Sequence, residues 1–392
     1  MAQFDPAAAT AAYLAALTPA QHAKAAAYTH GGHWLLLWTA MIAIAISWGI
    51  LKSGVLVRLR DSLERGGPKP WRVAVALMLV NGAIEALFSL PWSIYSDWWR
   101  EKSYGLTSQA FGGWLGEWAI DAVISVILIS LLLSGLYMLI RRTPKTWWIW
   151  GGALVGASVM TLMVLSPVFL QPIFNNYTPA PPGPVRDAVV ELAKANGVPP
   201  DKIYIYDGSK QSNRYTANVA GLFGTARVAM SDVMFKKDAD IAEVRGVVAH
   251  EMGHYVHQHT IWMALSLSIL ALVALFLIDR FFPLLRGVLP SAGVRGLGDP
   301  AAYPILAIML TVLGLVATPI RSTMIRMGET DADAFSVERS HEPDGLAKAL
   351  AKTIEYRAAT PTELEEVLFY DHPSVSRRIR RLMDWKAAHL KG

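Results

Sequence analysis

Six long apolar stretches alternate with polar segments along this chain. Each has about the 20 residues that a helix needs to cross the hydrocarbon core of a bilayer. They cover residues 34–57, 73–96, 116–140, 146–170, 261–284 and 301–320. Tryptophan pairs at 98–99 and 147–148 lie near their ends, where amphipathic rings suit the headgroup layer. The pattern predicts an all-α membrane protein with about six transmembrane helices.

A long polar segment, residues 175–259, separates the fourth apolar stretch from the fifth. It opens with a proline run that we expect to be a linker. Its periodicity then predicts a helix at 185–196, strands at 202–206 and 227–231, and a helix at 241–259. We therefore expect a small α+β insert in the membrane protein. Beyond the sixth stretch, helices with polar faces are expected at 327–338, 345–358 and 375–387.

These elements divide the chain into five parts. The Ala-rich N-terminus is too weakly apolar to span a bilayer, and it lacks the features of a cleaved signal peptide, so we expect an interfacial segment. The expected parts are an N-terminal segment (1–33), a four-helix transmembrane part (34–174), the insert (175–259), two further transmembrane helices (260–321) and a C-terminal helical part (322–392).

The composition supports a membrane location. Apolar residues make up 53% of the 392 residues and charged residues only 17%, which is too hydrophobic for an ordinary soluble protein of this size. The net charge of +5 suits anionic lipid headgroups, and no nucleic-acid motif accompanies it. We expect a lipid bilayer as partner, and no nucleic acid. The chain has no cysteine, which excludes disulfides and thiolate ligands.

Four strongly polar side chains interrupt the apolar stretches, namely Asn81, Glu85, Asp121 and Asp279. A carboxylate facing lipid is costly, so these groups should face a protein or water-filled interior. Hydrogen bonding between helices and a wet cavity both satisfy that requirement. The sequence leaves these two alternatives open.

The helix expected at 241–259 carries the chemistry. His250 and His254 are four residues apart and project from one helix face, where they can bind a single metal ion. Glu251 follows the first histidine, placed to take a proton from a water molecule at that metal. This spacing is typical of zinc hydrolases, although two surface histidines on an amphipathic helix give the same pattern.

A catalytic zinc needs a third protein ligand and an open fourth position. In one large class that ligand is a histidine six residues after the second, but Thr260 stands there. We therefore look to a distant helix, where Glu329 is the expected third ligand. Asp333, one turn later, is expected to hydrogen-bond a ligand imidazole from behind.

These residues resemble the CAAX prenyl protease family, the integral-membrane zinc endopeptidases that cleave prenylated C-terminal CaaX peptides. The resemblance covers most of the chain. Its motifs are residues 90–95, 101–106, 167–169, 172–175 and 207–210, the metal helix, Glu329 with Ala332 and Asp333, and His372 and Pro373 followed by Arg378 and Ile379.

The resemblance implies a fold, a metal and a set of roles. The helices would enclose an internal water-filled chamber. One Zn²⁺ per chain would be held by His250, His254 and Glu329, with Glu251 as general base. His372 and Arg378 would belong to the catalytic site. The function implied is an integral-membrane zinc metalloendopeptidase acting on peptides or proteins.

Two features separate this chain from the family's eukaryotic members. They have seven spans, whereas six are expected here. The family tends to place an asparagine followed by alanine before its edge strand, and this chain has Asn218 after Ala217. We take Asn218 as the substrate-binding candidate. A bacterial-type member that cuts CaaX-type peptides, or other membrane-associated peptides without a prenyl group, is compatible with both features.

A second function of a different class is a catalytically silent membrane chaperone or lipid-binding protein with a structural metal. Structural zinc sites are closed by four protein ligands, which His257 or His259 would have to complete. On a continuous helix both point away from the ligand face, so an open site is favoured. The strand at 227–231 is either an ordinary strand or a template on which an extended substrate pairs.

The segment around His372 has a catalytic and a structural interpretation. Pro373 is expected at the first turn of a helix, which would leave His372 at the cap position with Asp371 orienting its ring. A rigid imidazole there stabilises negative charge on a peptide carbonyl oxygen. The structural alternative is a capping histidine before a basic amphipathic helix. The resemblance favours the catalytic interpretation for His372 and Arg378.

Membrane orientation receives conflicting signals. A bacterial-type member implies a multi-pass protein of the cell inner membrane with its catalytic side in the cytoplasm. The positive-inside rule instead puts the first and third turns in the cytoplasm, and the insert outside. Those turns carry Arg58, Arg60, Arg65, Lys69, Arg72, Arg141, Arg142 and Lys145, against Arg100 and Lys102 in the second. We adopt the orientation that the resemblance implies.

Overall fold

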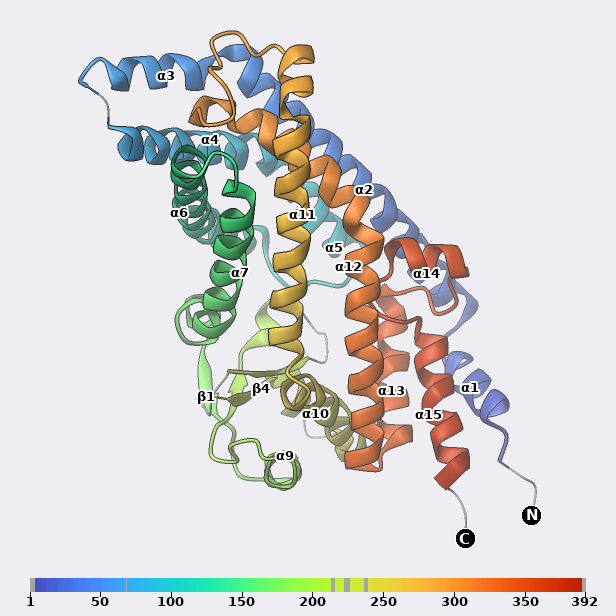
Figure 1. The fold of residues 1–392 in the computed structure, drawn as a ribbon. Coiled ribbons are helices and arrows are strands. Elements are labelled where there is room, and N and C mark those ends of the chain that lie inside the picture. Colours follow the sequence, from blue (N-terminus) through green and yellow to red (C-terminus); the bar gives the residue numbers. More distant parts are fainter. Residues whose placement is uncertain (1–3, 68, 213–215, 222–225, 236–238, 390–392) are drawn as a thin grey trace.

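A computed structural model describes residues 4–67, 69–212, 216–221, 226–235 and 239–389 of the chain (Figure 1). Its helices are α1 (Pro6–Leu14), α2 (Pro19–Ser53), α3 (Val55–Glu64), α4 (Pro70–Ser93), α5 (Arg100–Ser103), α6 (Phe111–Arg142), α7 (Trp147–Leu165), α8 (Gln171–Phe174), α9 (Pro184–Ala195), α10 (Ile241–Val256), α11 (His259–Val288), α12 (Tyr303–Ser340), α13 (Pro343–Lys352), α14 (Glu363–Phe369) and α15 (Val375–His389). Its strands are β1 (Tyr177–Pro179), β2 (Ile203–Tyr206), β3 (Ala217–Ala220) and β4 (Arg227–Ser231).

Within the described part of the chain, six helices are long and apolar enough to cross a membrane. They confirm the six expected spans, and each extends beyond its apolar stretch at one end or both. Their bounds are Pro19–Ser53, Pro70–Ser103, Phe111–Arg142, Trp147–Phe174, His259–Val288 and Pro300–Ser340. Two of them, the second and the fourth, contain π-helical turns that join α4 to α5 and α7 to α8. The internal chamber that the resemblance implies remains a prediction.

Two expected boundaries fall inside continuous helices. The N-terminal segment is α1 followed directly by the first half of α2, which Thr18 and Gln21 start with a capping box. The separate helix expected at 327–338 is the last part of α12, which runs without a break from the membrane span to Ser340. Residues 321–340 contain no proline, and Gly328 lies within the helix, so α12 continues to Ser340.

The metal helix is shorter than expected. We predicted it to end at residue 259, but α10 ends at Val256, and α11 begins at His259. Gln258 lies between them with φ of 55°, in the left-handed region that non-glycine residues rarely adopt. That single residue turns the chain from α10 into the fifth span. It also changes the direction in which His257 and His259 point.

The insert contains a four-stranded sheet in the order β1-β2-β4-β3. The strands at 202–206 and 227–231 were expected, whereas β1 and β3 were not, because the first lies in the proline run and the second contains only one β-branched residue, Val219. β4 pairs in parallel with β2 and antiparallel with β3. The expectation that a substrate could pair with β4 is wrong, because both of its edges are occupied. The outer strand beside it is β3.

Helix α10 packs between the sheet and the C-terminal helices at one end of the molecule (Figure 1). Its buried Val248 and Met252 join the core formed with β2 and β4. A Cβ added to Gly246 would lie 2.8 Å from the backbone nitrogen of Leu346 in α13. The buried Ser336 hydroxyl in α12 donates to the Gly246 carbonyl at 2.7 Å. These contacts fix α10 against α12 and α13.

The membrane half is held by its own polar contacts. The indole nitrogen of Trp147 in α7 donates to Asp279 in α11 at 2.7 Å, so inter-helix hydrogen bonding accounts for that carboxylate. At the end opposite the sheet, the buried Arg60 of α3 pairs with the buried Asp299 just before α12 (Figure 1).

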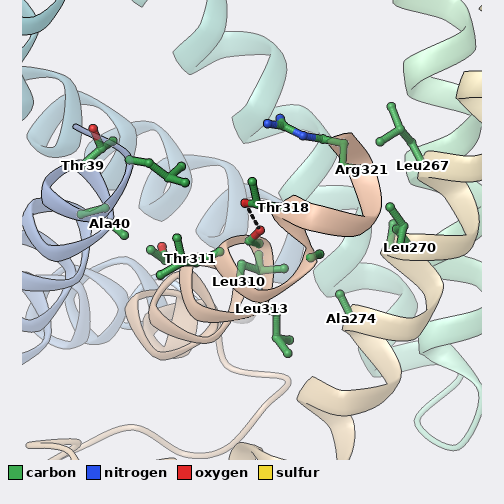
Figure 2. Close-up of a pocket in the computed structure, with 16 residues that line it drawn as sticks. Thr39, Ala40, Leu267, Leu270, Ala274, Leu310, Thr311, Leu313, Thr318 and Arg321 are labelled. Atoms are coloured by element: carbon green, nitrogen blue, oxygen red, sulfur yellow. Dashed lines mark hydrogen bonds between the residues drawn. The ribbon is translucent and has the colours of Figure 1, made fainter. Parts of the chain in front are cut away.

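An apolar pocket of about 540 Å³ lies between α2, α11 and α12. Figure 2 shows Thr39, Ala40, Leu267, Leu270 and Leu310 around it, with Arg321 at one side. Its lining is mostly aliphatic, with three threonines and Arg321, in keeping with its position along three of the spans. The pocket shows that these three spans do not close-pack along this stretch.

Candidate metal centre

Three donor atoms from α10 and α12 converge at the junction of the membrane half and the insert. Nε2 of His250 and Nε2 of His254 lie 3.2 Å apart. Oε2 of Glu329 is 3.3 Å from the first imidazole nitrogen, and Oε1 is 3.4 Å from the second. Tetrahedral zinc with nitrogen and oxygen ligands at about 2.0–2.1 Å separates its donors by about 3.3 Å. The two imidazole nitrogens and the two oxygens of this carboxylate therefore lie at the spacing that one such ion requires.

The environment of these atoms also fits a cation. His250 and Glu329 are both 7% exposed. The buried Oε2 atom of Glu329 accepts no hydrogen bond from any residue that the structure describes. A buried carboxylate oxygen without a donor carries an unfavourable desolvation free energy, which a bound cation would offset. The donor set and its burial thus suit a metal ion.

Behind His250 lies a buried pair of opposite charges. Nδ1 of His250 is 3.0 Å from Oδ1 of Asp333. The guanidinium of Arg378 donates from Nε and Nη2 to the two oxygens of Asp333, each at 2.7 Å. The same Nη2 lies 3.6 Å from Oε2 of Glu329. Arg378 thus contacts the two carboxylates and reaches His250 only through Asp333.

The surrounding charges control the protonation of His250. Burial alone lowers the pKa of this imidazole, but the carboxylates of Asp333 and Glu329 outweigh it and raise the pKa to about 10. A metal ion that binds Nε2 must therefore displace a proton from this ring.

Glu251 follows His250 in α10. Burial raises the pKa of its carboxyl above the usual range, while His250 and His254 oppose the shift. A glutamate with a raised pKa is suited to accept and return protons near neutral pH.

His372 reaches the same centre from the C-terminal part of the chain. Its Nε2 lies 3.3 Å from Oε1 of Glu329, and its Nδ1 lies 2.8 Å from Oδ1 of Asp371. The imidazole is one quarter exposed, so one side of it is open to an incoming molecule. The structure thus brings together His372 and the three donors, although more than 100 residues separate His372 from α10.

The cap expected at His372 is wrong. We predicted that Pro373 starts the last helix, but α15 begins at Val375. The amide of Arg378 donates to the carbonyl of Ser374 at 2.9 Å, so Ser374 is the residue before the first turn. Serine is a preferred N-cap residue, which accounts for the later start. His372 therefore lies in the loop between α14 and α15.

Two residues near the centre were not expected there. Nδ1 of His259 lies 2.9 Å from Nδ1 of His254, and Nε2 of His259 lies 3.0 Å from Oδ2 of Asp331. We expected His259 to point away from the ligand face because residues 241–259 were expected to form one continuous helix. The left-handed turn at Gln258 brings His259 back beside His254. No signal in the sequence marks a glutamine that adopts the left-handed conformation.

Asn218 lies on β3, where it pairs with Ala229 of β4. Its Oδ1 atom is buried and makes no hydrogen bond with any residue that the structure describes. β3 packs beside α10, so this unpaired acceptor lies on the strand nearest the metal helix.

Comparisons with known proteins decide the family. The profile of peptidase family M48 matches residues 179–386, which is more than half of the chain. The chain belongs to peptidase family M48. A second profile, described as the CAAX prenyl protease N-terminal region with five membrane helices, matches residues 6–176. Four of the six candidate spans described above lie in that stretch.

Full-length relatives agree with this assignment. The chain is 26% identical to the uncharacterized metalloprotease YhfN of Bacillus subtilis over 378 residues, covering 93% of this chain and 86% of the relative. It is 26% identical to CAAX prenyl protease 1 of Saccharomyces cerevisiae over 360 residues, covering 80% and 78%. The Arabidopsis thaliana homologue is 26% identical over 298 residues, covering 75% and 69%.

The fold has a solved counterpart in S. mikatae Ste24p. The crystal structure superposes with a TM-score of 0.75 over 93% of this chain and 89% of that chain. At 20% sequence identity the likeness is one of fold. Family and fold together make this chain a membrane metalloendopeptidase. A silent chaperone or lipid-binding protein is not favoured by these findings.

Proposed function

We propose that the chain hydrolyses peptide bonds with one Zn²⁺ held by His250, His254 and Glu329. The observation that carries this proposal is the spacing of the two imidazole nitrogens and the Glu329 carboxylate, which suits one tetrahedral ion, with Glu251 next to His250 in α10. A zinc ion bound there supplies Lewis acidity, which polarises a peptide carbonyl and makes a water molecule more acidic.

The chain's own residues carry out the other steps. Glu251 takes a proton from the attacking water and delivers it to the leaving amine. His372, held by Asp371, donates a hydrogen bond to the carbonyl oxygen as negative charge develops there. Asp333, whose Oδ1 lies 3.0 Å from Nδ1 of His250, would orient the ring and fix the tautomer with Nε2 free. These roles agree with the contacts described above.

Arg378 acts in this proposal as a positioning residue. Its contacts are with Asp333 and Glu329, and it is 5% exposed, so a substrate would reach it only by displacing other side chains. Fixing Asp333 fixes His250 in turn. This differs from the catalytic role that the sequence resemblance implies for Arg378.

Asn218 and β3 are the proposed peptide-binding elements. An extended substrate pairs with an exposed strand edge through main-chain hydrogen bonds. β3 is the outer strand of the described sheet and packs beside α10, and its Asn218 is only partly buried and has an unpaired amide oxygen. Substitution of Asn218 by alanine should raise KM on peptide substrates while zinc content stays unchanged. An unaltered KM would remove Asn218 from the substrate site.

The proposed substrates are CaaX-type or other membrane-associated peptides. Several relatives are named CAAX prenyl proteases, which supports peptides of that type, with or without the prenyl group. The spans and the centre belong to one molecule, so a substrate bound near a bilayer can reach the donors.

The deciding experiment uses the purified full-length chain on matched peptides. CaaX peptides with and without a prenyl group, and an unrelated peptide of equal length, would be incubated with and without a chelator. We expect chelator-sensitive cleavage that Glu329→Ala abolishes together with zinc binding. A Glu329→Ala variant with one full equivalent of zinc and the parent rate would contradict the proposed ligand set. Equal rates on the prenylated and plain peptides would show that the lipid is not required.

We further propose a cell inner membrane location with the catalytic side in the cytoplasm. The opposing charge count includes Arg60, yet this residue is buried in its pair with Asp299, so packing already accounts for its position. Arg141 likewise donates to the carbonyl of Gly298. A reporter fused at the C-terminus should therefore be active in the cytoplasm. A periplasmic reporter signal would reverse the assignment.

A further inference from the structure

A second group of metal-binding side chains lies next to the proposed catalytic centre. His257 comes from the turn between α10 and α11, His259 is the first residue of α11, and Asp331 comes from α12. Nε2 of His259 is 3.0 Å from Oδ2 of Asp331, and Nδ1 of His257 contacts the same oxygen. One donor atom from each of the three residues lies within 4.8 Å of the others.

The backbone and a buried ring hold these side chains in place. The left-handed conformation of Gln258 turns the chain so that the histidines on either side of it face Asp331. The ring of His257 packs edge-on against the buried Phe335, with centroids 5.2 Å apart. Because α12 supplies Asp331 as well as Phe335, the group needs no loop to close around an ion.

The donors determine which ions suit the group. Two imidazoles and one carboxylate favour zinc and similar first-row divalent ions over magnesium or calcium, which prefer oxygen ligands alone. The side chains of His257 and Asp331 are 38% and 47% exposed. An ion in solution can therefore reach this group directly, and water can complete its coordination.

A shared contact connects the two groups, because Nδ1 of His259 lies 2.9 Å from Nδ1 of His254. When Nε2 of His254 binds the catalytic zinc, the proton of that neutral ring is on Nδ1 and points at His259. His259 must then accept at Nδ1 and carry its own proton on Nε2, where it donates to Asp331. This arrangement stabilises His254 as a ligand.

An ion bound to Nε2 of His259 requires the opposite arrangement. Nε2 must then offer its lone pair, so the proton of the neutral His259 ring is on Nδ1. There it faces the Nδ1 proton of His254, and two donors oppose each other at a distance suited to one hydrogen bond. Occupancy of one group therefore disfavours occupancy of the other.

We propose that His257, His259 and Asp331 form a second, inhibitory site for zinc or a similar divalent cation. The inhibitory effect rests on the proposed function, because it acts through His254 as a catalytic zinc ligand. Coupling of this kind between two sites commonly changes affinity by roughly 5- to 150-fold. The enzyme would then lose activity when free zinc exceeds what its catalytic site needs.

The test measures zinc content and peptide cleavage on the same samples of the full-length protein, dialysed against buffered free Zn²⁺ of increasing concentration. The parent protein should bind one equivalent, then a second at higher zinc, and activity should fall as the second one binds. Asp331→Asn keeps the shape and one acceptor oxygen but removes the carboxylate, and His257→Ala removes one imidazole. His257→Ala should keep the first equivalent and the basal rate. Asp331→Asn is assessed on its second equivalent alone, because Asp331 also accepts from His259, which contacts His254.

In both variants the second equivalent should bind at least about tenfold more weakly, because losing a ligand costs no less than losing an outer partner. Inhibition should shift to higher zinc by the same factor. His389→Ala removes an exposed histidine from the end of α15 and should behave like the parent. A parent protein that saturates at one equivalent, or variants that bind the second equivalent as the parent does, would overturn the site.

A Glu329→Ala background separates this inference from the proposed function. There the first equivalent should be lost while the second still binds in an Asp331-dependent manner. If Glu329→Ala keeps the first equivalent, the proposed catalytic ligand set is wrong. The effect of Asp331→Asn on binding of the second equivalent still tests whether the second site exists. If zinc inhibition is unchanged although the second equivalent is lost, the site binds zinc but the inhibitory coupling is refuted.

Discussion

Arg378 and Asp333 face each other in a two-pronged pair, with Nε and Nη2 of the guanidinium each 2.7 Å from one carboxylate oxygen. Both residues are nearly inaccessible to solvent, and one of the two oxygens also lies 3.0 Å from Nδ1 of His250. The pair therefore stands between the C-terminal helix α15 and the metal helix α10. Its geometry leads to the first prediction.

Arg378→Ala should weaken zinc binding by about 10- to 100-fold, the usual effect of losing an outer partner of a metal ligand. The physical cause is that Asp333 loses its orientation and no longer fixes His250. Activity should return when the variant is saturated with zinc, because Arg378 does not touch the substrate. Competition against a chelator gives the affinity. A variant with unchanged zinc affinity and a low kcat at saturation would instead make Arg378 catalytic.

Arg380→Ala is the matched control for this test. Arg380 is exposed on the same helix and pairs only with Asp384 among the residues described, so its loss should leave zinc affinity unchanged. Such an exposed ion pair contributes roughly 1 kcal/mol or less to stability.

Glu251→Gln should keep one equivalent of zinc and reduce turnover by about 10²- to 10⁴-fold, the range for general acid–base catalysis. The amide preserves the shape of the side chain but cannot accept the proton from water. Zinc analysis and a peptide cleavage assay on one preparation measure the metal content and the turnover rate. An active Glu251→Gln variant would end the proposed mechanism.

His372→Ala should lower kcat by about 100-fold, as expected for one donor to a developing oxyanion, while zinc content stays unchanged. The imidazole lies beside Glu329 and is partly open, so its loss removes a contact to the substrate oxygen and no ligand. Steady-state kinetics at saturating zinc would measure the effect. Asp371→Asn should produce a smaller decrease, because it only loosens the ring. A parent-like rate for His372→Ala would assign the segment a structural role.

Gly246→Ala should destabilise the protein by about 1–3 kcal/mol, the usual cost of overpacking. The added methyl would lie 2.8 Å from the backbone of Leu346, which cannot move aside as a side chain tip can. Gly287→Ala is the control, since that helical glycine faces open space, and alanine favours helix by about 1 kcal/mol there. Thermal unfolding in detergent compares the two. Equal unfolding temperatures would show that α10 and α13 can separate freely.

The parts of the fold that a local pattern specifies were predictable. Hydropathy identifies the six spans because a bilayer demands apolar length, and the spacing of His250 and His254 identifies the metal helix because a helix repeats every 3.6 residues. Glu329 could be selected because a zinc site needs a third ligand. Its convergence with the histidines in space came only from the structure.

The parts that depend on packing or on single torsions were not predictable. Gln258 adopts a conformation that glutamine rarely takes, so the break between α10 and α11 was missed, and with it the positions of His257 and His259. β3 pairs with β4, and its own residues, with Val219 as the one β-branched side chain, do not signal a strand. Arg378 differs from the other arginines of α15 because it is buried against α12. The sequence of a basic helix does not show which of its arginines will be buried.

Helix α12 also connects the bilayer mechanically to the proposed metal ligands. It rises about 57 Å over its 38 residues, and it carries both a membrane span and Glu329. The histidines are likewise only a short turn away from α11, the span beside α12. The distance between the two sets of donors thus depends on the angle between two spans, which tilt to match the thickness of the membrane. We expect zinc affinity and rate to change together when the protein is reconstituted in lipids of different chain length, so that the enzyme responds to the bilayer in which it works.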